Sequence, residues 1–128
     1  MLQAIFMGTS AFAIPVLAAL VKNGAEVTVY TQPDKPSGRG RHLTASPVKK
    51  IAVEMNIPLR QPKSLLKKIV VDEICEVNPA VIVVASYGLL LPKTVIDLPR
   101  YGCLNIHPSL LPRYRGPSPI MAAILDGG

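Results

Sequence analysis

Cysteine is scarce in this sequence, with only Cys75 and Cys103 among 128 residues. The two have no C-x-x-C spacing, and neither has a histidine at the separation that zinc sites use. We therefore expect neither a disulfide framework nor a metal site. Both cysteines stand in apolar runs, EICEV and YGCLNI. Such positions are typical of buried, reduced thiols in a cytoplasmic protein.

Charge is absent from the first 21 residues, because Lys22 is the first charged side chain. A secretory signal peptide would carry Lys or Arg before its apolar stretch, which argues against that class. A membrane-spanning helix would not be interrupted by Gly8 and Pro15 near its centre. A strand, a turn and a helix in succession explain the segment better, and we expect a soluble protein that does not enter a membrane.

Glycine-rich nucleotide motifs are missing as well. A dinucleotide site needs G-x-G-x-x-G after the first strand, so that the backbone can approach the pyrophosphate. Here the turn reads GTSAFA (8–13), and no acidic residue closes the second apolar run at YTQ (30–32). The phosphate-loop pattern G-x-x-x-x-G-K-[ST] does not occur either. We therefore expect no NAD.

The chain does contain short apolar runs that alternate with amphipathic stretches. We expect strands over residues 2–8, 26–31, 57–62, 80–86 and 102–107. We expect helices that begin near Ala13, at Ser46-Pro47, after Ser64 and at Pro117, the first of them ending at Gly24. This alternation, with no linker or repeat, predicts one α/β domain with a doubly wound, mostly parallel, Rossmann-like sheet.

The helix after Ser64 has the most regular pattern. Ser64 should cap it by accepting a backbone N–H. Its apolar positions recur about every 3.6 residues and should face the sheet, while charged residues occupy the other side. These apolar positions are Leu66, Ile69, Val70, Ile74 and Val77.

Acidic residues are outnumbered, with 8 Asp and Glu against 14 Lys and Arg, a formal charge of +6 and a pI near 9.6. This favours a polyanionic partner such as nucleic acid, and a basic but inert surface is the alternative. The segment 32–47 carries Lys35, Arg39 and Arg41 against Asp34 alone. Structureless loops of this length are usually functional, so we interpret it as a flexible basic loop that meets a nucleic-acid backbone.

Two polar side chains stand at the end of the last expected strand. Asn105 and His107 are two residues apart, so both should point to the same side of the sheet. In such sheets ligands bind beyond the carboxyl ends of the strands. An amide donor can stabilise a developing oxyanion and an imidazole can move a proton, which acyl transfer requires. A histidine that only bonds local backbone is the alternative that this pattern leaves open.

Two more segments belong to the same expected rim. SYGLLLP (86–92) follows the strand at 80–86, and its leucines could line a flat heteroaromatic pocket or simply pack in the core. Arg113 and Arg115 flank Tyr114, which suits an anionic or stacked ligand, or ordinary solvated charge.

Four segments together resemble the methionyl-tRNA formyltransferase family: FMGTSAFAIPVL, QPDKPSGRGRHLTASPVK, VVASYGLLLP and GCLNIHPSLLPRYRGPSPI. The resemblance runs from Met1 to Gly128 and implies a single folate-binding catalytic domain over residues 1–128. It implies an enzyme of translation initiation that moves a formyl group from 10-formyltetrahydrofolate to the amino group of methionyl-initiator tRNA. The N-x-H…SLLP motif is shared more widely. A formyltransferase or hydrolase of a small amine or sugar, or a non-catalytic remnant, therefore stays open.

The resemblance also implies residue roles. Asn105 and His107 would be catalytic. Folate contacts would come from Leu89, Leu90, Leu91, Pro92, Ser109, Leu110, Leu111 and Pro112, and tRNA contacts from Lys35, Arg39, Arg41, Arg113 and Arg115. The family's catalytic aspartate and its C-terminal β-barrel, which also helps to bind tRNA, would lie beyond Gly128. We therefore expect a sheet that is incomplete at its C-terminal end, and we expect a monomer.

Overall fold

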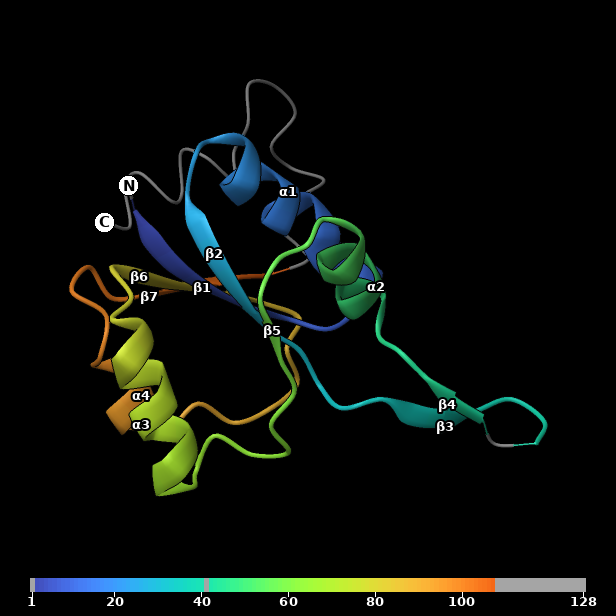
Figure 1. Ribbon diagram of the computed structural model, residues 1–128. Helices are drawn as coiled ribbons and strands as arrows, with labels where there is room; N and C mark the ends of the chain where they lie inside the picture. The colour runs from blue at the N-terminus through green and yellow to red at the C-terminus, as the bar shows by residue number, and fades with distance from the viewer. Residues whose placement is uncertain (1, 41, 108–128) are drawn as a thin grey trace.

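The structure is a computed structural model that describes residues 2–40 and 42–107 (Figure 1). Its centre is a five-stranded sheet in the order β5-β2-β1-β6-β7, in which every pairing is parallel. The strands are β1 (Gln3–Gly8), β2 (Glu26–Tyr30), β5 (Leu59–Arg60), β6 (Val81–Ala85) and β7 (Cys103–Ile106). The predicted parallel α/β sheet is confirmed.

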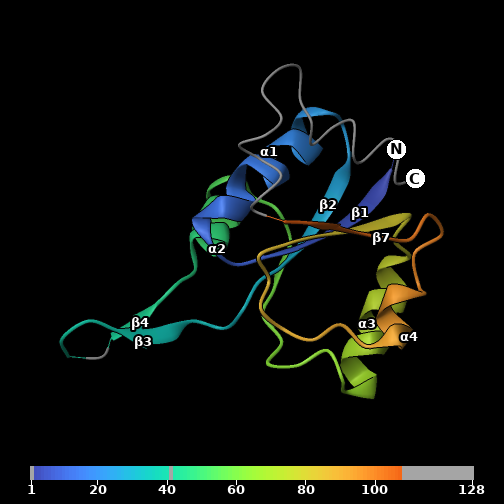
Figure 2. The same cartoon turned by 180° about the vertical axis from the view of Figure 1, so that it is seen from behind.

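Helices cover both faces of this sheet (Figures 1 and 2). On one face lie α1 (Ile14–Lys22), which continues the 3₁₀ turn η1 (Ala11–Ala13), and α2 (Pro47–Glu54). On the other face lie α3 (Lys68–Val77) and the short α4 (Lys93–Ile96). From β1 the chain adds β2 and then β5 on one side of β1. It then returns to the other side of β1, where it adds β6 and β7. The carboxyl ends of β1 and β6 therefore flank the switch point, where sheets of this kind bind ligands.

Two buried clusters, one on each face, hold the layers together. Alternate residues of β1 divide between them, with Ala4 and Phe6 on the α1 and α2 side and Ile5 and Met7 on the α3 and α4 side. All four side chains are fully buried. A parallel strand covered on both faces exposes neither, which is why these strands read as continuous apolar runs rather than alternating ones.

The first two helices begin where the sequence predicts. Pro15 stands in the first turn of α1, where a missing N–H costs nothing. Ser46 caps α2, because its Oγ accepts the N–H of Lys49 at 3.0 Å. Gly24 follows α1 with a φ of +84°, the left-handed conformation that glycine adopts most easily. Local chemistry therefore determines these boundaries.

The predicted start of α3 was wrong, and its predicted apolar face was right for Val70, Ile74 and Val77 but wrong for Leu66 and Ile69. The helix begins at Lys68, and Ser64 instead accepts the N–H of Leu66 at 3.0 Å in the turn before it. Because Leu65 is fully buried from that turn, Leu66 is left 62% exposed. Ile69 is also 67% exposed, so the helix buries chiefly Val70 and Ile74.

The segment 32–47 is not the structureless loop that its length predicted. It contains β3 (Lys35–Ser37) and β4 (His42–Thr44), which pair in an antiparallel hairpin. Gly38 and Gly40 between them have φ of +68° and +84°, which permits the tight reversal. The hydroxyls of Ser37 and Thr44 are hydrogen-bonded at 2.6 Å across the two strands. We call β3, β4 and the turn between them the basic hairpin.

Candidate active site

The loops after β1 and β6 are tied together at the carboxyl edge of the sheet. The N–H of Thr9 donates to the carbonyl of Ser86 at 2.9 Å, and its Oγ1 donates to the carbonyl of Tyr87 at 2.8 Å. The hydroxyls of Ser10 and Ser86 are also hydrogen-bonded to each other. Ser86 has a φ of +56°, an uncommon conformation for a residue with a side chain. These hydrogen bonds therefore join the two loops that border the switch point.

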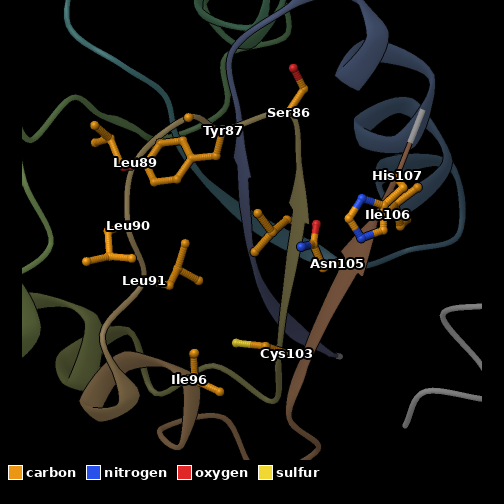
Figure 3. Close-up of a pocket in the computed structure, with 12 residues that line it drawn as sticks. Ser86, Tyr87, Leu89, Leu90, Leu91, Ile96, Cys103, Asn105, Ile106 and His107 are labelled. Atoms are coloured by element: carbon orange, nitrogen blue, oxygen red, sulfur yellow. The ribbon is translucent and has the colours of Figure 1, made fainter. Parts of the chain in front are cut away.

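A cavity of about 590 Å³ opens beside this edge (Figure 3). It is bordered by β6, by the loop that follows β6, by α4 and by β7. Its size is in the range of small-molecule sites. The residues that line it are Val84, Ser86, Tyr87, Gly88, Leu89, Leu90, Leu91, Ile96, Cys103, Asn105, Ile106 and His107.

Asn105 and His107 both line this cavity. Asn105 pairs with Val84 of β6, and His107 follows the last residue of β7. The neighbouring Leu104 and Ile106 pack into the cluster under α1 and α2, on the opposite face. Figure 3 shows the amide of Asn105 facing across the cavity towards the leucine loop, with the imidazole of His107 beside it at the rim. Both side chains are exposed, so a ligand can reach them.

The sequence left open whether the leucines after β6 line a pocket or pack in the core, and in the structure they do both. Leu89 and Leu91 pack partly into the cluster under α3 and α4, and they also line the cavity. Leu90 lines it while remaining 72% exposed. Pro92 is not among the lining residues and instead occupies the N-cap position of α4. The loop therefore presents an apolar wall to the cavity that a flat ring could cover.

The remaining predicted site residues fall into two groups. Lys35 lies in β3 and Arg39 in the turn of the basic hairpin, and both are exposed. The other predicted site residues lie outside the described residues, and they are Arg41, Ser109, Leu110, Leu111, Pro112, Arg113 and Arg115. The predicted helix at 117–125 lies outside them as well. Their roles stay predictions.

Sequence reasoning did not identify Tyr87, Ile96 or Cys103 as residues of the cavity, and it misjudged the cysteines. Tyr87 is almost fully buried. This burial raises the pKa of its phenol, and the nearby Tyr30 raises it by a smaller amount. Cys103 lines the cavity, and burial, with a smaller effect of Asp97, raises the pKa of its thiol to about 11. The prediction that both thiols are buried was wrong, because Cys75 is exposed and Cys103 only partly buried. Cys75 lies on the outer side of α3, a position that its apolar neighbours did not reveal.

These cysteines predict an alkylation pattern that tests the cavity without an activity assay. At pH 8 iodoacetamide should modify the exposed Cys75 first, because only a small fraction of Cys103 is thiolate well below its pKa. Raising the pH from 8 to 10 should speed Cys103 modification by about a hundredfold, since thiolate grows tenfold per pH unit below the pKa. Mass spectrometry of peptides gives both rates. Equal rates at pH 8 would contradict the burial of Cys103.

Two further observations concern the described part of the chain. Within residues 2–40 and 42–107, no three His, Cys, Asp or Glu side chains are grouped so that they could hold a metal ion. None of the helices in these ranges has the length and apolar character that crossing a bilayer requires.

The chain is similar to known proteins over almost its whole length. The family model described as formyl transferase matches residues 2–128. Methionyl-tRNA formyltransferases from Hydrogenovibrio crunogenus and Legionella pneumophila are 53% and 50% identical over 127 residues, and that from Alkaliphilus oremlandii is 48% identical. Each match covers 98% of this chain but only 40–41% of the relative. The chain thus spans about two-fifths of the length of these relatives.

A solved structure has the same fold. The crystal structure of glycinamide ribonucleotide transformylase 1 from Geobacillus kaustophilus aligns with a TM-score of 0.57 at 21% identity. The alignment covers 98% of this chain and 67% of that one. At this identity the likeness concerns the architecture of the sheet and its helices.

Proposed function

The chain belongs to the formyl transferase family, and on that premise we propose that it transfers a formyl group from 10-formyltetrahydrofolate to the amino group of methionyl-initiator tRNA. Residues 1–128 would form the folate-binding catalytic domain of a cytoplasmic, monomeric enzyme of translation initiation. The observation that carries the proposal is that Asn105 and His107 line one cavity together with the apolar loop Leu89–Leu91. The identity of about 50% to methionyl-tRNA formyltransferases supports the choice of acceptor.

The cavity suits a folate donor in size and lining. A pterin ring is flat and heteroaromatic, so it needs an apolar surface and polar groups at its edge. The apolar surface would come from Leu89, Leu90 and Leu91, and the polar groups would come from the backbone of the loop around Gly88. Ser109, Leu110, Leu111 and Pro112 are proposed as further folate contacts. When bound, the folate supplies the formyl carbon that the amine attacks.

Asn105 and His107 would then divide the chemistry between them. As the amine attacks the formyl carbon, negative charge develops on the formyl oxygen, and the N–H₂ of Asn105 can donate a hydrogen bond to it. The attacking amine must also lose a proton, which His107 can accept at a ring nitrogen. As the bond between the formyl carbon and N10 of the folate breaks, His107 can return that proton to N10, so that tetrahydrofolate leaves. In this family a catalytic aspartate would orient that imidazole and stabilise its charged form.

The basic hairpin favours tRNA over a small amine as the acceptor. Lys35 and Arg39 lie on it with exposed side chains, and it projects away from the sheet (Figures 1 and 2). A small amine or sugar would need no such arm. We propose that Lys35, Arg39, Arg41, Arg113 and Arg115 contact the RNA backbone.

Removing the charge of Arg39 should test this assignment. In the protein at its full natural length, Arg39→Ala should weaken binding of initiator tRNA and reduce the slope of log affinity against log salt by about one. Fluorescence anisotropy over a salt series measures both. Lys22→Ala is the matched control, because Lys22 is exposed at the end of α1, opposite the carboxyl edge of the sheet.

Formyl transfer itself separates the alternatives. The full-length protein should formylate methionyl-initiator tRNA with 10-formyltetrahydrofolate and leave free small amines unchanged. Transfer to a small amine in preference to tRNA would replace the proposal by the small-substrate alternative. Absence of any transfer would favour the remnant.

A further inference from the structure

Among the described residues, the hydrogen bonds that join the basic hairpin to the rest of the domain lie at its base. Every described residue of β3 and β4 is exposed, and Figures 1 and 2 show the two strands extending away from the sheet. At the base, the hydroxyls of Thr31 and Ser46 are hydrogen-bonded at 2.7 Å. Lys49 at the start of α2 binds the carboxylate of Asp34 at 2.9 and 3.0 Å. These contacts join the chain that enters the hairpin to the chain that leaves it.

One residue at this base also reaches the wall of the cavity. The side-chain amide of Gln32 donates to the carbonyl of Tyr87 at 2.7 Å, and Thr9 donates to the same oxygen at 2.8 Å. The backbone N–H of Gln32 is 3.4 Å from the Thr9 hydroxyl. We call these hydrogen bonds the Gln32 latch. They connect the start of the basic hairpin to the loop whose next residues, 88–91, line the cavity.

The loop after β6 is shaped to receive this amide. Gly88 has a φ of +88°, and a Cβ at this position would stand 2.1 Å from Nε2 of Gln32. Any side chain at residue 88 would therefore displace the amide as well as strain the backbone. The glycine of the cavity wall and the glutamine of the hairpin base fit each other.

A second amide holds the other side of the latch. Nε2 of Gln61 lies 3.3 Å from the carbonyl of Gln32 and 2.8 Å from Oδ1 of Asp34. The hydrogen bond from Gln61, and then Lys49, lowers the pKa of Asp34 below its ordinary value. The ion pair is therefore complete at neutral pH, and its contribution to stability is lost only as the pH falls through that lowered pKa.

We propose that Gln32 is a positioning residue that couples the cavity to the basic hairpin, so that binding of the folate and binding of the tRNA favour each other. This inference rests on the proposed function. A ligand packed against Leu89–Leu91 restricts the loop, and the Gln32 latch passes that restriction to the base of the hairpin. RNA then meets a hairpin already held in one orientation and loses less conformational freedom on binding. Linkage requires the same factor in the reverse direction.

The test measures initiator tRNA affinity in the full-length protein, with and without saturating tetrahydrofolate, which carries no formyl group to transfer. In the unmodified protein tetrahydrofolate should tighten tRNA binding by about fivefold or more. Gln32→Met keeps the length of the side chain and removes the donor, so it should bring this ratio to about one. The matched control is Gln3→Met. The amide of Gln3 donates to Glu26 where β1 and β2 begin, and its removal should leave the ratio unchanged.

The outcomes separate this inference from the proposed function. If the unmodified protein binds no initiator tRNA, both fall. If it binds tRNA but tetrahydrofolate has no effect, or Gln32→Met keeps the full ratio, the coupling is overturned and the proposed function stands. If Gln32→Met does not fold by circular dichroism, Thr9→Val removes the other donor to the Tyr87 carbonyl. That variant should also lower the ratio, and an unchanged ratio would overturn the inference.

Discussion

Replacing His107 with Ala is expected to lower kcat for formyl transfer by about two to four orders of magnitude, the usual contribution of a positioned acid or base. Asn105→Ala should lower it by about two to three orders, as loss of an oxyanion donor does. Both residues line the cavity from the end of β7 and act on the same step. The double variant should therefore lose much less than the product of the two single losses. Single-turnover formylation of methionyl-initiator tRNA measures each rate.

Asn23→Ala is a suitable control for these changes. Asn23 is an exposed asparagine whose amide donates to the carbonyl of Ala19 at the end of α1. Its replacement should leave kcat unchanged. Tetrahydrofolate binding should survive in Asn105→Ala and His107→Ala, because the apolar wall is intact. Full activity in either variant would remove that residue from the chemistry, and loss of folate binding would assign it to the pocket instead.

Gly8→Ala is expected to destabilise the protein by about 3 kcal/mol, at the upper end of overpacking effects. A Cβ at this position would lie 2.8 Å from the Cβ of Ala13, the carbonyl oxygen of Ala85 and the ring of Phe6. The carbonyl belongs to β6, which pairs directly with β1 here, so it cannot move without parting the two strands. The same movement would shift Thr9 and the edge of the cavity, and kcat should fall with stability. Urea unfolding gives the free energy.

Gly24→Ala provides the comparison for this second prediction. Gly24 has open space around its missing Cβ and a φ of +84°, so only the left-handed backbone is strained, at a cost of about 1–2 kcal/mol. It lies at the far end of α1 from the cavity, and kcat should be unaffected. A Gly8→Ala protein as stable as Gly24→Ala would mean that the switch point has room that its packing does not suggest.

The strands could be predicted because burial on both faces leaves a strong sequence signal. Runs such as AIFM and VIVVA carry no polar residue, and the structure places them at the centre of the sheet. Helix starts followed from proline and a capping serine at α1 and α2. The start of α3 did not, because Leu65 rather than Leu66 fills the core and Lys67 precedes the helix without a capping side chain.

The pair at the end of β7 was also accessible to sequence reasoning. Two residues apart on a strand is a rule of geometry, and both Asn105 and His107 line the cavity. The hairpin within 32–47 was not accessible, since three-residue strands with exposed side chains have no apolar pattern. Gln32 gave no signal either, because its partner is a backbone carbonyl 55 residues away.

The order of residues alone determined which segments become the strands of the parallel sheet, which family the chain joins, and that an amide and an imidazole share one side of a strand. Periodicity, caps and motifs are properties of neighbours in the chain, so they can be read without coordinates. Only the tertiary structure decided that Tyr87, Cys103 and Ile96 complete the cavity, and that the basic arm is a hairpin joined to its wall through Gln32. Those arrangements depend on how distant segments pack, and packing against a backbone atom imposes no pattern on the sequence.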